Sequence, residues 1–226
     1  FAGNLSSKLK NDIYLKREDM QPIFSFKIRG AYNKIVNLTT QQKQRGVIAA
    51  SAGNHAQGVA NACRKLKIPC FIVMPVTAPE IKVKSVKRFG SKVLLHGDSF
   101  DQAVKKAKQM AKDQKLEFIE AFDDPLTIAG QGTIGKEILE EQSGLDAIFV
   151  PVGGGGLLAG ISAWVAQTKK DIKIYGVEVD DSACLVEAIK ADKRVRLREV
   201  GLFADGVAVE RIGKNNFDVI RECVDG

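Results

Sequence analysis

Two kinds of segment alternate along the middle of this chain. Short apolar runs typical of buried parallel strands are separated by stretches whose apolar residues recur every three or four positions, as in amphipathic helices. The pattern predicts strands at 46–50, 69–74, 92–96 and 116–119, with helices through 66, at 79–89 and at 99–114. Three successive strand–helix units predict a compact three-layer α/β unit with a parallel sheet.

The flanking segments carry the same two signals. A short strand is expected at 12–16, followed by a helix for which Ser25 is a plausible N-cap. Its apolar residues at helical spacing are Ile28, Ala31, Tyr32 and Ile35. The later elements expected are a helix at 126–141 interrupted by residues 130–132, a buried strand at 146–152, a helix to 167, a strand at 172–179 and a helix at 182–190.

Composition narrows the class of protein without identifying it. The 226 residues are 45% apolar and 27% charged, which is ordinary for a soluble globular protein. No apolar run reaches the roughly 18 residues that span a bilayer, so no membrane contact is expected. The net charge of +7 comes from lysines spread along helix faces without interleaved aromatics. Solvated helix faces explain that pattern better than a nucleic-acid site does.

Cysteine and histidine usage argues against a metal centre. Cys63, Cys70, Cys184 and Cys223 form no C-x-x-C pair, and the histidines are His55 and His96. A structural zinc site is therefore not expected. Four cysteines without a pattern fit free thiols in a reducing compartment.

The glycine loop, residues 153–156, follows a predicted strand directly and opens a predicted helix. Backbone N–H groups in such a turn, free of Cβ atoms and at a helix N-terminus, favour a phosphate. A simple tight turn is the alternative, but four glycines lose much conformational entropy on folding. The spacing Gly154-x-Gly156-x-x-Ala159, with Glu178 ending the next strand, also satisfies a loose dinucleotide-binding fingerprint. A nicotinamide-dependent dehydrogenase therefore remains an alternative.

Two further features of the sequence supply binding or reactive groups that the glycine loop lacks. The turn at 51–58 joins a strand to a helix and could receive a carboxylate, although a generic helix cap is the alternative. Lys27 falls in the first turn of its helix, where the helix dipole disfavours a cation. It is either a surface lysine or an amine kept near neutrality for imine chemistry. Together, an amine, a carboxylate turn and a phosphate loop are the parts of a pyridoxal phosphate enzyme acting on an amino acid, whereas a dehydrogenase explains only the loop.

The same stretches resemble the fold-type II pyridoxal phosphate enzymes and, within them, the branch of biosynthetic threonine dehydratases. The residues that carry the resemblance are 16–19, 25–31, 51–58, 125–132, 152–157, 176–178, 181–185 and 200–209. The resemblance covers essentially the whole chain. It implies an α/β fold of two three-layer lobes with mostly parallel sheets: a small lobe at 46–122 inserted into a large cofactor-binding lobe formed by 1–45 and 123–226.

The resemblance also implies a role for each matching residue. Lys27 would bind pyridoxal 5′-phosphate through an imine bond and later take the Cα proton, while Phe26 would lie against the cofactor ring. Asn54 would bond the cofactor's 3′-oxygen. The residues implied to hold the phosphate are Gly153, Gly154, Gly155, Gly156 and Leu157. The turn implied to receive the substrate carboxylate contains Ser51, Ala52, Gly53, Asn54 and His55.

The implied reaction is the dehydration and deamination of L-threonine to 2-oxobutanoate and ammonia, the first step of isoleucine biosynthesis, with side activity on L-serine. Another β-eliminating enzyme of this fold, such as a serine dehydratase or a threonine synthase, is the alternative. The resemblance further implies a homo-oligomer, either a dimer or a tetramer. The expected location is the cytoplasm or, in a eukaryote, the mitochondrial or plastid matrix.

Three departures from the family pattern refine these expectations. Ala52 stands where serine racemases carry a serine acid–base group, which disfavours racemisation. Cys184 stands six residues after Glu178, where cation-binding relatives carry an acidic residue, so no divalent metal site is expected. The usual partner of the pyridine nitrogen would lie beyond Gly226, so the chain is expected to be the N-terminal part of a catalytic domain.

Overall fold

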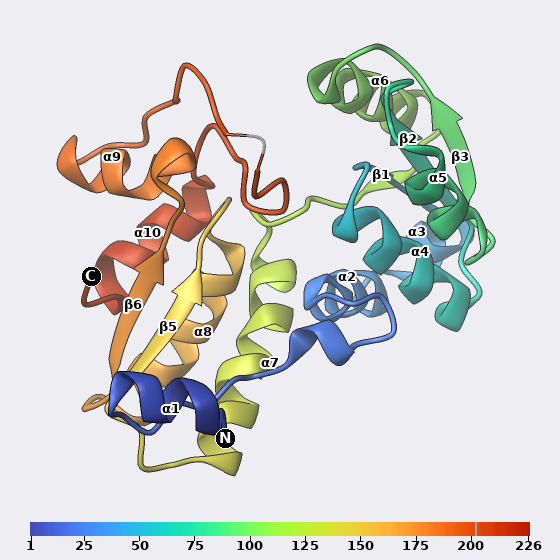
Figure 1. Ribbon diagram of the computed structural model, residues 1–226. Coiled ribbons are helices and arrows are strands. Elements are labelled where there is room, and N and C mark those ends of the chain that lie inside the picture. The colour runs from blue at the N-terminus through green and yellow to red at the C-terminus, as the bar shows by residue number, and fades with distance from the viewer. Residues whose placement is uncertain (202) are drawn as a thin grey trace.

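The computed structural model describes residues 1–201 and 203–226, which form two bodies on either side of a central helix (Figure 1). The first body contains a parallel sheet of β1 (Val47–Ala50), β2 (Cys70–Met74), β3 (Lys92–Leu95) and β4 (Glu117–Phe118), in the order β3-β2-β1-β4. The four predicted strands are confirmed, each slightly shorter than expected.

Helices cover both faces of this sheet, as the alternating strand–helix pattern predicts. One strand face packs Val47 and Ala49 into a cluster with α4 (Asn54–Leu66) and α5 (Glu80–Lys87). The opposite face packs Ile48 and Ala50 against α6 (Phe100–Asp113). Ser99 caps α6 as expected, because its hydroxyl accepts the Gln102 N–H at 3.3 Å.

The second body contains a two-stranded parallel sheet of β5 (Ala147–Pro151) and β6 (Lys173–Val177). Around it lie α7 (Pro125–Glu141), α8 (Gly156–Thr168), the 3₁₀ turn η2 (Asp180–Ser182), α9 (Cys184–Lys190) and α10 (Lys214–Cys223). The expectation that β5 is buried is wrong. Ile148 and Val150 are buried, but Phe149 is 68% exposed and stacks on Tyr175, since only one face of the pair is covered.

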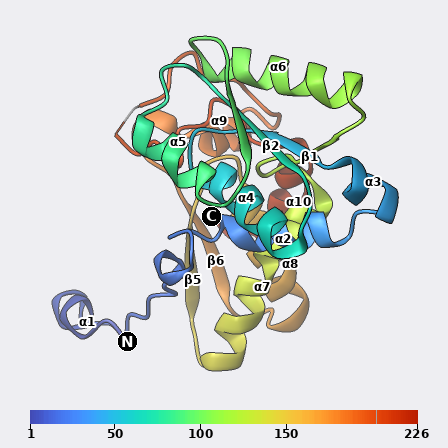
Figure 2. The same cartoon turned by 90° about the vertical axis from the view of Figure 1, so that its right-hand side faces the viewer.

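The helix α2 (Lys27–Val36) lies between the two bodies (Figure 1) and packs against α4 and α7. Figure 2 shows α2 beside α4. Ile28, Ala31 and Ile35 are buried as expected, but Tyr32 is 39% exposed and lies outside the apolar face. A short helix that the sequence analysis does not include, α3 (Thr40–Arg45), follows it. Thr39 begins α3 with a capping box.

The expected interruption of α7 is wrong, because the helix is continuous through Gly130 and Gly132. A Cβ on Gly130 would lie 2.7 Å from the carbonyl oxygen of Arg29, and one on Gly132 would lie 2.8 Å from that of Gly160. These glycines therefore let α2 and α8 approach the backbone of α7 closely. The buried Gln131 between them accepts the Gly30 N–H at 3.2 Å.

The expected strand at 12–16 is also wrong. The segment runs between α1 (Gly3–Leu9) and the 3₁₀ turn η1 (Glu18–Met20) as irregular chain. Its backbone bonds join the Ala2 N–H to the Ile13 carbonyl at 2.8 Å and the Glu18 N–H to the Lys16 carbonyl at 3.1 Å. Within the described residues no strand lies beside it, and a strand requires a partner. The final strand is shorter than expected, since β6 ends at Val177 and η2 follows.

No helix in the described part of the chain is long and apolar enough to cross a bilayer. The four cysteines are free thiols, as the sequence analysis expects. Leu202, within the 200–209 stretch that carries part of the resemblance, lies outside the described residues.

Candidate active site

Lys27 is the first residue of α2, where the sequence analysis places it. The Ser25 hydroxyl accepts the Lys27 backbone N–H at 3.2 Å. The N-cap residue of α2 is nevertheless Phe26, without a side-chain cap bond, so the expectation that Ser25 is the N-cap is wrong by one residue. The side chain is half-buried, and its Nζ donates to the Ala121 carbonyl at 3.0 Å and lies 5.2 Å from the centre of the Phe26 ring. Burial lowers the pKa of this amine to about 8. These contacts favour the interpretation of a functional amine over that of a surface lysine.

His55, in the first turn of α4, lies close enough to Lys27 to be influenced by its charge. Its Nε2 is 2.9 Å from the Ile119 carbonyl. A carbonyl can only accept, so this nitrogen carries the hydrogen and Nδ1 is left as an unpartnered acceptor among the described residues. Burial chiefly, together with the charge of Lys27 and against the opposing effect of the bond to Ile119, lowers the pKa of His55 to about 4. The imidazole is therefore neutral at physiological pH.

The 51–58 turn joins β1 to α4, as expected. Ser51, Ala52 and Gly53 are half-buried, Asn54 is exposed at the first position of the helix, and the Ser51 hydroxyl accepts the Gly53 N–H at 3.1 Å. No side chain among the described residues caps α4. The N–H groups of its first turn are therefore available to an anion.

The glycine loop opens α8. Gly155 occupies the N-cap position with φ at 88°, a left-handed conformation that favours glycine. A Cβ on Gly154 would lie 2.4 Å from the Phe122 ring, and one on Gly156 would lie 2.7 Å from the Phe122 carbonyl. Within the described residues, no backbone carbonyl accepts from the N–H groups of 153–157. The loop thus packs closely against Phe122 on one side and leaves its backbone N–H donors free.

The segment 119–123, between β4 and α7, connects these three features. Three of its carbonyls accept hydrogen bonds: that of Ile119 from His55 Nε2, that of Ala121 from Lys27 Nζ, and that of Phe122 from the Asn216 amide, the last at 3.1 Å. The sequence analysis missed this segment. A carbonyl acceptor is present at every position, so no residue type marks its role.

Arg29, two residues beyond Lys27, ties α2 to two other segments. Its guanidinium bonds Glu18 at 2.7 and 2.8 Å and Glu137 of α7 at 2.6 and 2.7 Å. Lys16 also pairs with Glu137, at 2.8 Å. Arg29 chiefly, with help from Lys16, lowers the pKa of Glu137 to about 2. The charged stretch at 16–19 thus helps to fix the helix that carries Lys27.

The carboxylate of Glu178 is occupied by backbone N–H groups and is not free to bind a ribose, as the corresponding acid of a dehydrogenase would be. Its carboxylate accepts the N–H groups of Leu185 and Val186 at 2.9–3.1 Å and so caps α9. Burial raises the pKa of this carboxyl. Cys184 is buried beside it, with Sγ 3.6 Å from the Gly153 carbonyl. In residues 1–201 and 203–226 no three His, Cys, Asp or Glu side chains form a group that could hold a metal ion.

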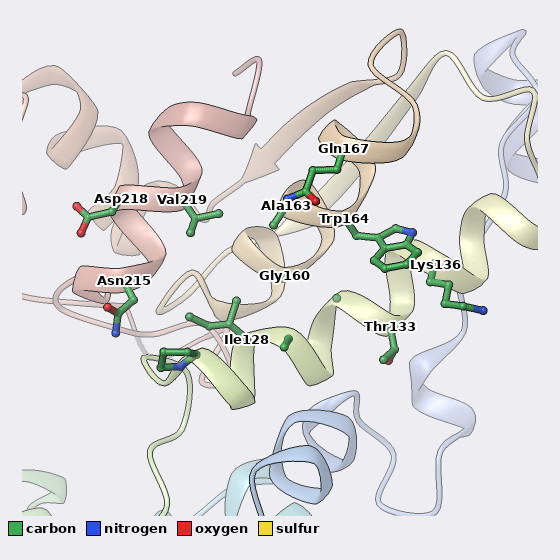
Figure 3. A pocket seen from close by; sticks show the side chains of 13 residues that line it. Ile128, Thr133, Lys136, Gly160, Ala163, Trp164, Gln167, Asn215, Asp218 and Val219 are labelled. Atoms are coloured by element: carbon green, nitrogen blue, oxygen red, sulfur yellow. The ribbon is translucent and has the colours of Figure 1, made fainter. Parts of the chain in front are cut away.

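A groove on the described surface lies away from these residues. It encloses about 620 Å³ between α7, α8 and α10 and is lined mainly by apolar side chains, among them Ile128, Trp164 and Val219 (Figure 3). Lys27, the 51–58 turn and the glycine loop do not line it. This groove therefore does not mark the candidate active site, whereas the shared contacts of segment 119–123 do.

Comparison with known proteins places the chain in a family. The family model described as "Pyridoxal-phosphate dependent enzyme" matches residues 1–226. The chain is 54% identical over 223 residues to the L-threonine dehydratase biosynthetic IlvA of Pasteurella multocida, covering 99% of this chain and 44% of that protein. It is 52% identical over 226 residues to the chloroplastic biosynthetic threonine dehydratase of Arabidopsis thaliana, covering 100% of this chain and 38% of that one.

A solved structure agrees with the sequence comparison. The processed form of threonine deaminase isoform 2 from Solanum lycopersicum superposes with a TM-score of 0.98 at 46% identity, covering 100% of this chain and 66% of that one. The chain thus spans less than half the length of the curated relatives above. With a family model that matches every residue and a fold shared with threonine deaminase, this chain belongs to the pyridoxal-phosphate dependent enzymes.

Proposed function

We propose that the protein containing this chain is a threonine dehydratase, which converts L-threonine to 2-oxobutanoate and ammonia. The observation that carries the proposal is the identity of about half, over essentially the whole chain, to proteins named biosynthetic threonine dehydratases. The placement of Lys27, the 51–58 turn and the glycine loop around segment 119–123 supports it. The proposed role in isoleucine biosynthesis and the side activity on L-serine follow from the same similarity.

The described residues fit the cofactor of the family. The glycine loop offers N–H groups without backbone acceptors at the N-terminus of α8, which suits a phosphate. We propose that Gly153, Gly154, Gly155, Gly156 and Leu157 hold it. Lys27 offers a buried amine for covalent attachment, and its neighbour Phe26 offers a ring face. When bound, pyridoxal 5′-phosphate supplies an electron sink for the negative charge that develops at Cα.

Lys27 is the proposed base. An amine with a pKa of about 8 is half neutral at pH 8, whereas an ordinary lysine is neutral in only about one molecule in 250. A neutral amine has the free electron pair needed to attack a carbonyl carbon and to take the Cα proton. The Ala121 carbonyl orients this nitrogen without adding a negative charge that would raise its pKa.

The 51–58 turn is the proposed receptor for the substrate carboxylate. The imidazole of His55 is neutral and donates to Ile119, so a carboxylate near it would meet only the lone pair of Nδ1. We therefore assign the contact of His55 to its backbone N–H, together with Ser51, Gly53 and Asn54 at the start of α4. Asn54 is exposed at the mouth of this turn and is also the proposed partner of the cofactor's 3′-oxygen.

Ala52 favours elimination over racemisation. Its methyl group cannot exchange a proton, so the position at which serine racemases carry an acid–base serine offers no proton to the opposite face of Cα. In elimination the proton removed by Lys27 need not be replaced, because the β-hydroxyl departs instead. This difference supports a dehydratase rather than a racemase.

The proposal is tested with the full-length protein loaded with pyridoxal 5′-phosphate. Release of 2-oxo acid is measured with L-threonine and L-serine, and Lys27→Ala serves as the inactive control. We expect faster turnover of L-threonine and loss of activity in the variant. Absence of 2-oxo acid from L-threonine would refute the dehydratase, and full activity of K27A would refute the role of Lys27.

Three broader features are proposed with it. The chain at 46–122 would be a small lobe inserted into a larger one formed by 1–45 and 123–226. The protein would be a homo-oligomer, a dimer or a tetramer, which sedimentation equilibrium would check. Its location would be the cytoplasm or an organellar matrix, since the similar proteins include a bacterial and a chloroplastic one.

A further inference from the structure

Asn216 is a buried polar residue that the proposed reaction does not use. It lies in the first turn of α10, which packs against α8, and its side chain is 0% exposed. Its Nδ2 donates to the Gly154 carbonyl at 2.6 Å and to the Phe122 carbonyl at 3.1 Å. Both acceptors belong to the candidate site. We propose that Asn216 is a positioning residue that sets the glycine loop in its phosphate-binding conformation.

The argument starts from the geometry of one peptide bond. In a trans peptide the C=O and the following N–H point in opposite directions. The Gly154 carbonyl is held by two donors from the start of α10, Asn216 Nδ2 and the Gly213 N–H at 3.1 Å. The N–H of Gly155 must therefore point away from α10. This fixes the direction of one of the donors proposed to meet the phosphate.

A glycine loop needs such an external constraint more than other loops do. Residues without Cβ atoms have many accessible backbone conformations, so ordering them costs conformational entropy. Gly155 also adopts a left-handed conformation, and a Cβ on it would lie 3.1 Å from the Cβ of Asn216. Asn216 thus contacts the loop by packing as well as by its amide. Holding the loop before the ligand arrives lowers the entropy that binding must lose.

The second bond extends the effect to the lysine end of the site. Phe122 follows Ala121, whose carbonyl accepts from Lys27 Nζ. By bonding Phe122 and Gly154 together, one amide fixes the distance between the amine and the phosphate loop. These are the two places where the family's cofactor would be anchored.

The orientation of the amide follows from its neighbours. Two carbonyl oxygens can only accept, so the NH₂ group must face them and a flipped amide would place oxygen against oxygen. In the described part of the chain, Oδ1 is then a buried acceptor without a partner. A carboxylate in its place would repel both carbonyls. The site therefore requires an amide rather than an acid of the same shape.

The inference rests on the proposed role of the glycine loop, and the test separates the two. Apoprotein at full length is titrated with pyridoxal 5′-phosphate and with pyridoxal, which lacks the phosphate, and binding is followed by the absorbance of the Lys27 adduct. We expect Asn216→Ala to lower the affinity for pyridoxal 5′-phosphate by about ten- to a hundredfold. This is the range found when groups that orient metal ligands are removed. Pyridoxal affinity should change by less than about threefold.

Two further variants complete the design. Asn216→Asp keeps the shape of the side chain, removes its N–H donors and adds a negative charge. Its loss of affinity for pyridoxal 5′-phosphate should therefore exceed that of N216A. Asn215→Asp adds the same charge one residue away, at a side chain exposed to solvent, and should change the affinity for either ligand by less than about threefold. If N216A does not fold, Asn216→Thr keeps one hydroxyl donor in a similar volume and is expected to show an intermediate, phosphate-specific loss.

The outcomes are distinct. An equal loss for both ligands would mean that Asn216 supports only the fold, and unchanged affinity for both would mean that it positions nothing. Either result would overturn the proposal. If the unaltered protein binds pyridoxal as tightly as its phosphate, the glycine loop itself is not the phosphate site, and the proposed roles of its residues fail together with this one.

Discussion

The buried amine of Lys27 should cost the apoprotein stability, and removing it should restore that stability. The amine's pKa falls from 10.5 to about 8 because burial disfavours its charged form. A lysine whose pKa is lower in the folded than in the unfolded chain destabilises the folded state below the folded pKa. The cost vanishes as the pH rises through the unfolded pKa.

The size of the effect follows from the two pKa values. With 1.36 kcal/mol for each tenfold change in proton affinity, the cost is about 3 kcal/mol at pH 7. It falls to about 2 kcal/mol at pH 9 and to less than about 1 kcal/mol at pH 10. The variant Lys27→Met removes the charge and keeps an unbranched apolar stem. We expect it to be more stable than the unaltered apoprotein by up to this amount, less the lost bond to Ala121.

The assay is urea unfolding of both apoproteins, at full length and without cofactor, between pH 7 and pH 10. Cofactor is removed because a ligand that binds only the folded form adds its own stabilisation. Lys84→Met, at a surface side chain that is 69% exposed, serves as the control and should change stability by less than about 0.5 kcal/mol. A gain for K27M that is absent at pH 7, or the same at pH 7 and pH 10, would refute the reasoning.

Three other predictions concern the neighbours of Lys27. Gly154→Ala would place a Cβ 2.4 Å from the Phe122 ring, so cofactor affinity measured by absorbance should fall at least about tenfold, and unchanged affinity would contradict the packing argument. Arg29→Met leaves the carboxylates of Glu18 and Glu137 without their guanidinium partner, and we expect the free energy of unfolding to fall by about 2–3 kcal/mol at pH 7. This is less than is usual when a buried ion pair is broken, because Glu137 is 37% exposed. The pKa of Glu137 is about 2 in the folded protein, so its contribution to this stability is complete above about pH 5 and is lost as the pH falls towards 2. The urea midpoints of the unaltered protein and of R29M should therefore converge at low pH. His55, with a pKa of about 4, should keep constant imidazole NMR shifts between pH 5.5 and 7.5, and a midpoint near 6.5 would contradict its burial.

Local signals in the sequence predict much of the fold correctly. The strands β1 and β2 are recognisable because their apolar runs are continuous, and the 51–58 turn because small residues join a strand to a helix. The position of Lys27 at a helix start follows from the spacing of buried residues, although the N-cap is Phe26 rather than Ser25. Each of these depends on residues within one helix or strand.

The errors occur where the outcome depends on distant residues. Residues 12–16 have the composition of a strand, but a strand forms only beside a neighbour. Gly130 and Gly132 weaken a helix locally, yet α7 needs them because other backbones approach it there. Phe149 has an apolar side chain but lies on the open face of its sheet. Asn216 joins segments more than 60 residues away in sequence, and no local pattern distinguishes it from the exposed Asn215.

Segment 119–123 has a consequence for how this site tolerates substitution. Its contacts to His55, Lys27 and Asn216 are made by main-chain oxygens, which every amino acid possesses. Side-chain changes at Ile119, Ala121 or Phe122 can therefore alter packing without deleting these acceptors. A mutational scan would report packing effects there and overlook the electrostatic role of the main-chain oxygens. Replacing single amides of this segment by esters, which weakens the carbonyl as an acceptor, is the perturbation that would expose it.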